Sequence, residues 1–473
     1  MPGKDLFPDF SRREAVTGAL GVAALAATGP VFAQGSGDRP NFLFILADDM
    51  GFADLSCYGR QEYETPVLDG LARDGMRFTH AYANSAVCTA SRVAIITGRY
   101  QYRLPIGLQE PLSTQDVGLP PEAPTVASYL RAQGYATSLI GKWHLGAPPK
   151  YDPLKSGYEE FWGLRGGGVD YFRHDFGGRH DLWDGDTNVK EAGYLTNILA
   201  DRTMQTLDRR KADGRPFFIS LHFTAPHWPW QGPDEEGRAE SDRIAASGNP
   251  AGIFHYDGGT MDTYAAMVRS MDENIGRVLE KLVALGMDRN TVVVFTSDNG
   301  GERFSNTWPF TGKKSELLEG GLRIPSIVRW PGLTKPGSTS DVPVMHMDWL
   351  PTFVEAAGGS VDAAAPTDGL NLTPVLTGGT LPERTLFWRF KNMDQKAVRR
   401  GRMKYLSIGG NEYLFDVVAD PLERGNLKDR QPEVFAALKQ AYDVWNADML
   451  NDPNAPSYGF SARQLADHFG IDD

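Results

Sequence analysis

Four short apolar segments of this chain stop abruptly at charged, amide or imidazole side chains, and this arrangement constrains the fold more than any other feature. The segments are rich in β-forming residues and occur in NFLFILADDMG, ATSLIGKWHLG, PFFISLHFTAPHWP and TVVVFTSDNGG. Helical patterns lie between them, in TPVLDGLARDGM, APTVASYLRAQG and YAAMVRSMDENIGRVLEKLVALG. Strands that alternate with helices predict an α/β fold with a large, mostly parallel, doubly wound sheet flanked by helices.

The polar residues that follow these strands are expected to meet at one edge of the sheet. They are Asp48, Asp49, Lys142, His144, His227, Asp298 and Asn299. In doubly wound sheets the ligand crevice lies outside the carboxyl ends of the parallel strands. The pattern therefore predicts a single site built from four separate parts of the chain.

The predicted site combines metal-binding oxygens with positive charge. Hard oxygen ligands, which suit Ca²⁺ or Mg²⁺, come from Asp48, Asp49, Asp298 and Asn299. Cationic or basic side chains come from Arg92, Lys142, Lys314, His144 and His227. A basic pocket around a divalent metal indicates a sulfate or phosphate ester as the substrate. Each residue alone has an ordinary structural explanation, as we expect for His222 and His346, so the prediction depends on convergence.

Composition excludes some functions and leaves the role of one cysteine open. The 473-residue chain has a net charge of −12 and no basic run, so nucleic-acid binding is not expected. Its two cysteines, Cys57 and Cys88, allow a single disulfide but no disulfide framework. Cys88 stands where an apolar helix begins, in AVCTASRVAIITGR. Packing, pairing with Cys57 and chemistry are all open for it at this point.

The N-terminal segment has the pattern of an export signal. Arg12 and Arg13 precede a stretch without charged residues that closes on Val31-Phe32-Ala33. We expect residues 1–33 to be a Tat-type signal peptide, with the Tat export machinery as a partner and a periplasmic or secreted mature protein. The alternative is a short, uncleaved membrane anchor, but the stretch is short for a span and is interrupted by Pro30.

The sequence blocks, taken in order, resemble those of the type I formylglycine-dependent sulfatases of the alkaline phosphatase superfamily. CTASR with the following VAIITGR is similar to the sulfatase signature Cys-x-Pro/Ala-x-Arg with its downstream Thr-Gly-Arg. The blocks PNFLFILADDMGFADLSCYG, GKWHLG, APHWP, TSDNGG and KKSELLEGGLRIP resemble other family blocks, from Pro40 to about Pro331. NEYLFDVVADPLERGNLKD resembles the C-terminal subdomain of the family.

This resemblance implies a function and a role for each site residue. It implies hydrolysis of a sulfate ester, after oxidation of Cys88 to formylglycine, whose hydrated diol is the nucleophile. It implies a metal, Ca²⁺ rather than Mg²⁺, bound by Asp48, Asp49, Asp298, Asn299 and an oxygen of modified residue 88. It implies that Arg92 contacts the diol and that Lys142 and Lys314 bind the sulfate. It also implies that His227 is the general acid and His144 the base. Counting back from Glu319-Gly320-Gly321 selects Lys314, with Lys313 as the alternative.

Ala90 departs from the commonest form of the signature, in which proline stands at this position. The departure favours an anaerobic radical maturase over the oxygen-dependent formylglycine-generating enzyme as the maturation partner. Tat export is compatible with this maturation, because that route carries proteins that are already folded and modified in the cytoplasm.

A glycine- and aromatic-rich stretch, GLRGGGVDYFRHDFGGRHDLW, is predicted to form the wall around the leaving group. Its candidate substrate-binding residues are Asp170, Tyr171, Arg173 and His174. Aromatic and charged side chains together favour a sulfated carbohydrate over a small aryl sulfate, whereas a loop with its own small core would have a similar composition.

We expect a catalytic domain over residues 34–375 and a C-terminal α+β subdomain over residues 376–473. TLFWRF, KAVRRGRMKYL and NEYLFDV are predicted to form short antiparallel strands, and PEVFAALKQAYDVWNADML a closing helix.

Two other functions compete with a sulfatase. One is a phosphomonoester or phosphonate hydrolase on the same fold, for which a serine or threonine would be expected in place of Cys88. The other is a non-catalytic protein that binds sulfated glycans, which requires an unmodified Cys88.

Overall fold

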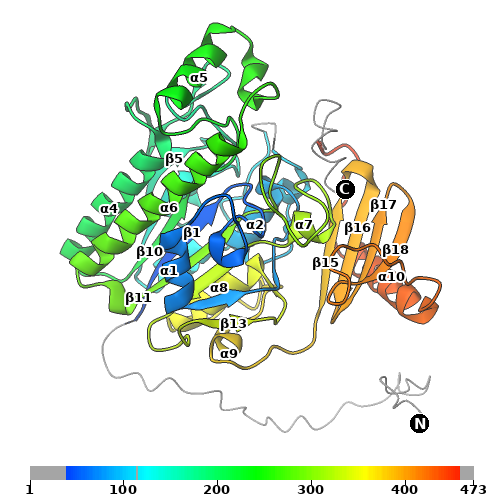
Figure 1. The fold of residues 1–473 in the computed structure, drawn as a ribbon. Coiled ribbons are helices and arrows are strands. Elements are labelled where there is room, and N and C mark those ends of the chain that lie inside the picture. The colour runs from blue at the N-terminus through cyan, green and yellow to red at the C-terminus, as the bar shows by residue number, and fades with distance from the viewer. Residues whose placement is uncertain (1–38, 113–115, 459–473) are drawn as a thin grey trace. The chain divides into compact units, whose positions relative to one another are not determined.

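The fold is built around a ten-stranded sheet whose centre is parallel, as the computed structural model shows for residues 39–112 and 116–458. The strand order is β13-β2-β12-β11-β1-β10-β4-β5-β8-β9. The parallel centre consists of β1 (Asn41–Ala47), β4 (Ala136–Lys142), β5 (Glu160–Leu164), β10 (Phe217–His222) and β11 (Thr291–Ser297). The four strands predicted from sequence are therefore confirmed, and they lie side by side (Figure 1).

The outer strands are short and mostly antiparallel to their neighbours. On one side β12 runs antiparallel to β11 and β2, and β13 pairs with β2 in parallel; on the other, β5, β8 and β9 pair antiparallel in turn. Their bounds are β2 (Met76–Phe78), β8 (Trp183–Asp184), β9 (Thr187–Asn188), β12 (Ser326–Arg329) and β13 (Ser338–Ser340). These strands extend the sheet without contributing strand-end residues to the predicted site.

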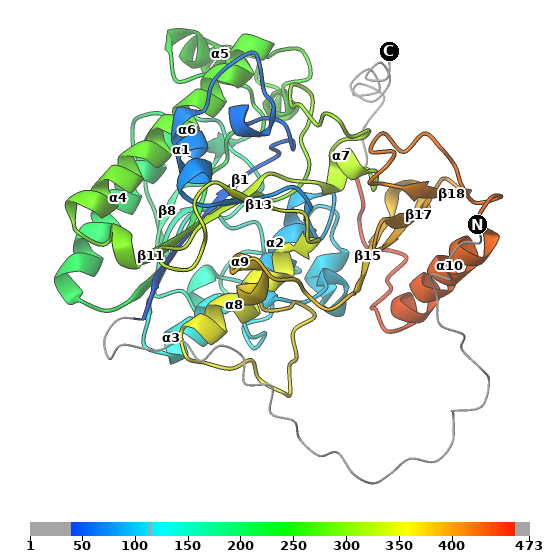
Figure 2. The same cartoon turned by 60° about the horizontal axis from the view of Figure 1, so that its bottom comes forward.

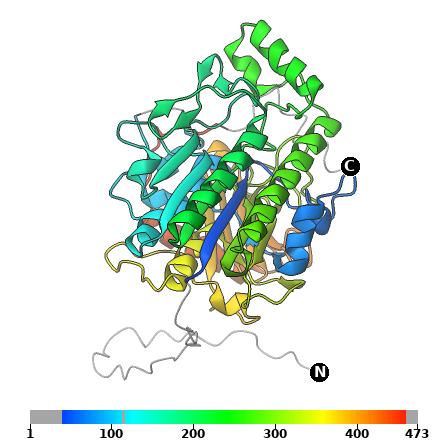
Figure 3. The same cartoon turned by 90° about the vertical axis from the view of Figure 1, so that its left-hand side faces the viewer.

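Helices cover both faces of the sheet. One face carries α1 (Pro66–Asp74), α4 (Leu195–Asp213) and α6 (Met261–Ala284), of which α4 and α6 are the long green helices in Figure 3. The other carries α2 (Cys88–Thr97), α3 (Val126–Ala132) and α8 (Trp349–Ala356). Successive residues of β1 point to opposite faces, so Leu43 packs in the first core and Phe44 in the second. Burial on both faces explains why the strands have continuous apolar runs.

The C-terminal part forms a second, four-stranded antiparallel sheet in the order β15-β16-β17-β18. Its strands are β15 (Thr385–Phe390), β16 (Gln395–Arg400), β17 (Met403–Ile408) and β18 (Asn411–Asp416), and helix α10 (Pro432–Ala447) packs on it (Figure 2). The stretch KAVRRGRMKYL forms two of the predicted antiparallel strands, β16 and β17. The chain reverses at Gly401, whose φ of +55° lies in the left-handed region that favours glycine.

The four-stranded sheet shares an apolar core with the segment that leads into α2. Trp388 and Leu386 of β15 pack with Val87 and Ala90. The predicted boundary after residue 375 falls within helix α9 (Thr373–Leu376), just before β15, and the domain division stays a prediction.

The remaining elements are short, apart from helix α5 (Glu235–Ala246). They include β3 (Ala81–Tyr82), β6 (Asp175–Phe176), β7 (Arg179–His180), α7 (Glu319–Leu322) and β14 (Val344–Met345). Among the helices that the structure describes, none combines the length and apolar character needed to cross a bilayer. The predicted signal peptide, residues 1–33, lies outside the described residues.

Candidate active site

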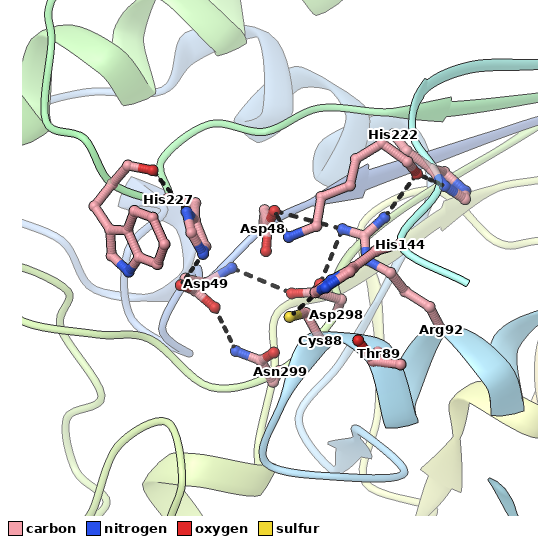
Figure 4. Close-up of polar contacts among 12 residues, drawn as sticks. Asp48, Asp49, Cys88, Thr89, Arg92, His144, His222, His227, Asp298 and Asn299 are labelled. Carbon is pink, nitrogen blue, oxygen red and sulfur yellow. Dashed lines mark hydrogen bonds and ion pairs between the residues drawn. The ribbon is translucent and has the colours of Figure 1, made fainter. Parts of the chain in front are cut away.

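Two adjacent parallel strands bring the predicted acidic residues together. β1 and β11 pair in register up to Ala47 and Ser297, so the residues that follow both strands emerge at the same level. The backbone N–H of Asp49 donates to Oδ1 of Asp298 at 3.2 Å, and Nδ2 of Asn299 donates to Oδ1 of Asp49 at 2.8 Å (Figure 4). Asp49 has a φ of +64°, so this close approach requires a left-handed backbone at a non-glycine residue. All four predicted metal ligands from the strand ends are buried.

The next strands along the sheet supply a lysine and two histidines to the same edge. Lys142 ends β4, and its Nζ lies 2.5 Å from Oδ2 of Asp48. His227 follows β10, and its Nε2 lies 3.5 Å from Oδ2 of Asp49. His144 follows β4 with a φ of +58°. The convergence predicted from the strand pattern is thus present in the structure.

Helix α2 places Cys88 and Arg92 in this cluster. Cys88 is the first residue of α2, and its Sγ lies 3.3 Å from Nδ1 of His144. Arg92 lies four residues later, on the same face of the helix. Its Nη2 is 2.9 Å from Oδ2 of Asp298 and 3.6 Å from Oδ2 of Asp48, and its Nη1 donates to the Lys142 carbonyl at 3.0 Å. The guanidinium therefore links three strand ends.

The approach to α2 is fixed by a local hydrogen-bond pattern. The Ser91 hydroxyl donates to the carbonyl of Ser85 at 2.8 Å and accepts from its N–H at 3.0 Å. No side chain caps the helix at Val87, so the backbone N–H groups of the first turn stay available beside Cys88. A helix N-terminus favours negative charge, which suits an anionic substrate at this point.

Lys314 faces the site, whereas the adjacent Lys313 does not. Nζ of Lys314 lies 2.5 Å from Oδ2 of Asp49. Nζ of Lys313 donates to the backbone carbonyl of Arg303 at 3.1 Å. Of the two lysines that sequence counting left open, the structure places Lys314 beside the carboxylate cluster, and its role in binding sulfate stays a prediction.

Burial and the neighbouring charges shift the pKa values of the site residues. Burial raises the pKa of Asp48 to about 8, and the neighbouring Asp298 carboxylate adds to this effect. Burial alone would raise the pKa of Asp49, but Lys314 and His227 hold it below its ordinary value. Burial also raises the pKa of the Cys88 thiol, so the thiol stays protonated at neutral pH. An unmodified Cys88 is thus a poor nucleophile.

The donor set fits a hard divalent cation. Asp48 Oδ1 and Asn299 Oδ1 are buried without a hydrogen-bond partner within the described structure. Ligand atoms of Asp48, Asp49 and His227 lie within 4.8 Å of one another. Buried oxygens that lack donors, next to carboxylates that repel one another, are what a bound Ca²⁺ or Mg²⁺ would satisfy.

Two glycines that sequence reasoning missed lie against the histidines. A Cβ added at Gly167 would lie 2.6 Å from Cε1 of His144, whereas one at Gly168 would lie 3.3 Å from Cε1 of His227. The signal was present in the sequence as the run Gly166-Gly167-Gly168. His222 and His346, expected to be structural, bond the backbone carbonyls of Lys142 and Ser297 behind the site.

The predicted substrate-binding segment has mainly internal contacts. The Tyr171 hydroxyl donates to the carbonyl of His227 at 2.9 Å, and Asp170 accepts from Ser241 at 2.7 Å. Asp170, Tyr171 and His174 are buried, while the Arg173 side chain is 26% exposed and paired with Asp170 at 3.1 Å. These contacts favour the alternative of a loop with its own core, which supports His227 from behind. Substrate contact by this segment stays a prediction.

Comparisons with known proteins identify the family of the chain. A family model described as Sulfatase matches residues 40–360. N-acetylgalactosamine-6-sulfatase of Canis lupus familiaris is 30% identical over 427 residues, which cover 82% of this chain and 76% of that protein. Arylsulfatase J of Mus musculus is 30% identical over 472 residues, with 86% and 76% covered. A crystal structure of Ps i-CgsB in complex with k-i-k-neocarrahexaose matches with a TM-score of 0.79 and 28% identity, over 92% of this chain and 98% of that one.

Removal of divalent metal should make stability depend on pH through Asp48. Because its pKa in the metal-free fold is raised from 3.8 to about 8, the fold binds this proton more tightly than the unfolded chain does. The stabilising contribution is therefore complete below about pH 4 and is lost as the pH rises towards 8. We expect the Tm of metal-stripped protein to fall between pH 5 and pH 8, and Ca²⁺ to raise it more at pH 8 than at pH 5.

The matched variant for this prediction is Asp48→Asn, which cannot ionise at this position. Its metal-free Tm should vary less over the same pH range, and Ca²⁺ should raise its Tm less. Equal pH slopes for the two proteins, measured by calorimetry in the same buffers, would contradict the assignment to Asp48.

Proposed function

The chain belongs to the sulfatase family and hydrolyses sulfate esters, and we propose that its substrate is a sulfated saccharide attacked from residue 88. The observation that carries this proposal is the position of Cys88 at the first turn of α2, between His144 and the carboxylate cluster. The saccharide is supported by the similarity to an N-acetylgalactosamine-6-sulfatase and to a structure solved with neocarrahexaose.

Residue 88 requires modification to serve as the nucleophile. Its thiol is buried and protonated. A thiol that took up the sulfuryl group would also have no neighbouring hydroxyl on the same carbon to expel sulfate. Oxidation of Cys88 to formylglycine supplies, when hydrated, one hydroxyl to attack sulfur and a second to release sulfate. The sequence CTASR around Cys88, which matches the family signature with Ala90, supports this modification.

The cations of the site would orient the substrate anion. Lys142 pairs with Asp48, and Lys314 pairs with Asp49. Each ammonium group would contact one oxygen of the substrate sulfate. Arg92 is held by Asp298 and the Lys142 carbonyl, so its guanidinium is fixed beside residue 88. A divalent cation on Asp48, Asp49, Asp298 and Asn299, which we propose to be Ca²⁺, would polarise the sulfate oxygens and stabilise ionised oxygen at residue 88.

The two histidines can serve opposite proton transfers. Nε2 of His144 bonds the Leu112 carbonyl at 3.4 Å and therefore carries the proton, which leaves Nδ1 as an acceptor facing residue 88. His144 would thus take the proton that frees sulfate. His227 donates through Nδ1 to the Trp228 carbonyl at 2.7 Å, so its Nε2 is the atom that would protonate the departing oxygen.

The proposals for export and maturation are supported by the sequence rather than by the geometry of the site. The pair Arg12-Arg13 supports Tat export to the periplasm, and Ala90 supports maturation by an anaerobic enzyme before export. Both are parts of the same proposal, because a residue buried as deeply as Cys88 is modified before the chain folds around it.

Mass spectrometry of the peptide that spans residue 88 tests the nucleophile. Protein made together with an anaerobic maturase should show a loss of about 18 Da at this residue, and turnover of a sulfate ester should follow the modified fraction. Cys88→Ala is the matched control and should be inactive. An intact thiol in fully active protein would overturn the proposal, and phosphate or phosphonate turnover above sulfate turnover would favour the competing hydrolase.

The two histidines should respond differently to the leaving group. Because His227 protonates the departing oxygen, His227→Gln should lower kcat/KM by roughly 100-fold or more for a saccharide sulfate and far less for 4-nitrophenyl sulfate, whose leaving group needs no proton. His144→Gln acts on release of sulfate from residue 88 and should lower kcat similarly for both substrates. Equal losses in the His227→Gln variant would contradict its role as the acid.

The glycine run offers a matched pair of substitutions. Gly167→Ala places a methyl 2.6 Å from the His144 ring and forces the ring to move, which should lower kcat by about 100-fold. Gly168→Ala makes only contacts of 3.3 Å or more with His227 and Trp228 and should change kcat little. Steady-state kinetics of both variants measures this difference in kcat, and thermal denaturation confirms that both variants fold. Equal kcat values for the two variants would show that a displaced His144 ring still functions.

A further inference from the structure

We propose that Gln395, on the C-terminal four-stranded sheet, is a positioning residue for Lys314. This inference rests on the proposed function, in which Lys314 binds the substrate sulfate. Gln395 is the first residue of β16, and its side-chain hydrogen bonds go to Ser315, Leu317 and Asn392. Its effect would pass through the backbone of the segment that carries Lys314.

The backbone around Lys314 is tied directly to the site on one side. The N–H of Lys314 donates to the carbonyl of Gly301 at 2.9 Å, two residues after the metal-binding Asn299. The N–H of Ser315 donates to the carbonyl of Ala86 at 2.9 Å, two residues before Cys88. These two bonds anchor the N-terminal side of the segment, so a displacement beyond Ser315 would act on the site through the position of Lys314.

The same segment contains a strained residue that needs external support. Ser315 has a φ of +72°, a left-handed conformation that side chains other than glycine rarely adopt. Such a conformation persists when surrounding contacts fix it. The N–H of Ser315 is held by its hydrogen bond to the Ala86 carbonyl. The carbonyl of Ser315 needs a separate partner.

The carboxamide of Gln395 supplies this partner and also binds the backbone two residues further on. Nε2 donates to the Ser315 carbonyl at 2.8 Å, and Oε1 accepts from the Leu317 N–H at 2.8 Å. Nε2 also donates to the carbonyl of Asn392 at 3.2 Å, so these partners are satisfied in only one orientation of the amide. Gln395 is 1% exposed, and water cannot readily replace these bonds.

A buried ion network anchors the far end of the same segment to the sheet. Lys404 of β17 lies 2.9 Å from Glu319 and 2.9 Å from Glu423, and Oε2 of Glu423 accepts from the Glu319 N–H at 2.6 Å. Glu319 begins α7, which Figures 1 and 2 show beside the four-stranded sheet. With this end fixed by ions, the bonds of Gln395 determine the course of the chain between Lys314 and α7.

A double-mutant cycle with Lys314 tests the inference, with 4-nitrophenyl sulfate as substrate and inorganic sulfate as inhibitor. Gln395→Met keeps the side-chain size and removes all three hydrogen bonds of the carboxamide. We expect it to lower kcat/KM roughly tenfold and to raise the inhibition constant of sulfate in proportion. In a Lys314→Ala background the same substitution should change kcat/KM less than twofold, because there is no ammonium left to misplace.

Arg384→Met is the matched control, at the residue before the first strand of the same sheet. Arg384 precedes β15 and binds Asp348 through two contacts, at 2.7 and 2.5 Å, without touching the segment of Lys314. This variant should lower the Tm but leave kcat/KM within about twofold of the wild type. A loss of activity as large as that of Gln395→Met would show that loosening the sheet is enough, and would overturn the proposal.

A second variant keeps the test decisive if Gln395→Met does not fold. Gln395→Glu retains the acceptor for the Leu317 N–H but loses the donor to the Ser315 carbonyl, so it should also weaken sulfate inhibition only when Lys314 is present. A full tenfold loss in the Lys314→Ala background, in an enzyme that is otherwise active, would refute the inference. Failure of the proposed function would instead appear as absence of turnover in the mature wild type.

Discussion

The structure depends on a concentration of buried negative charge that no single element could hold. Asp48, Asp49 and Asp298 lie together at the ends of β1 and β11, where burial and mutual repulsion raise the pKa of Asp48. Carboxylates in such surroundings are stable only beside cations or a bound metal. Positive charge therefore has to reach this point from other parts of the fold.

Each cation arrives on a different part of the fold. Arg92 comes from the first turns of α2, Lys142 from the end of β4, and Lys314 from the segment before α7. Because these parts are far apart in sequence, the site forms only when the large sheet, α2 and the segment before α7 have come together. The same arrangement that neutralises the carboxylates provides the positive pocket that a sulfate ester requires.

Strand-end residues could be predicted because parallel topology leaves little freedom. Once β1, β4, β10 and β11 are recognised as parallel neighbours, their polar ends must converge. Helix α2 was predictable for a similar reason, since Ser91 and the apolar residues after it favour a helix that starts near Cys88. Loops were less predictable: the segment of Asp170 and Tyr171 has side chains suited to sugar, but it uses them for internal bonds.

Sequence by itself determined the sheet, the strand-end residues and the family to which the signature around Cys88 points, because these features depend on local pattern and on rules of chain connection. Tertiary structure alone decided which of two adjacent lysines lies beside Asp49, since the backbone contacts of the Lys314 segment come from residues distant in the sequence. It also decided that Gln395, from a separate sheet, fixes that segment. Such contacts join residues with no local relation in the sequence, so only packing reveals them.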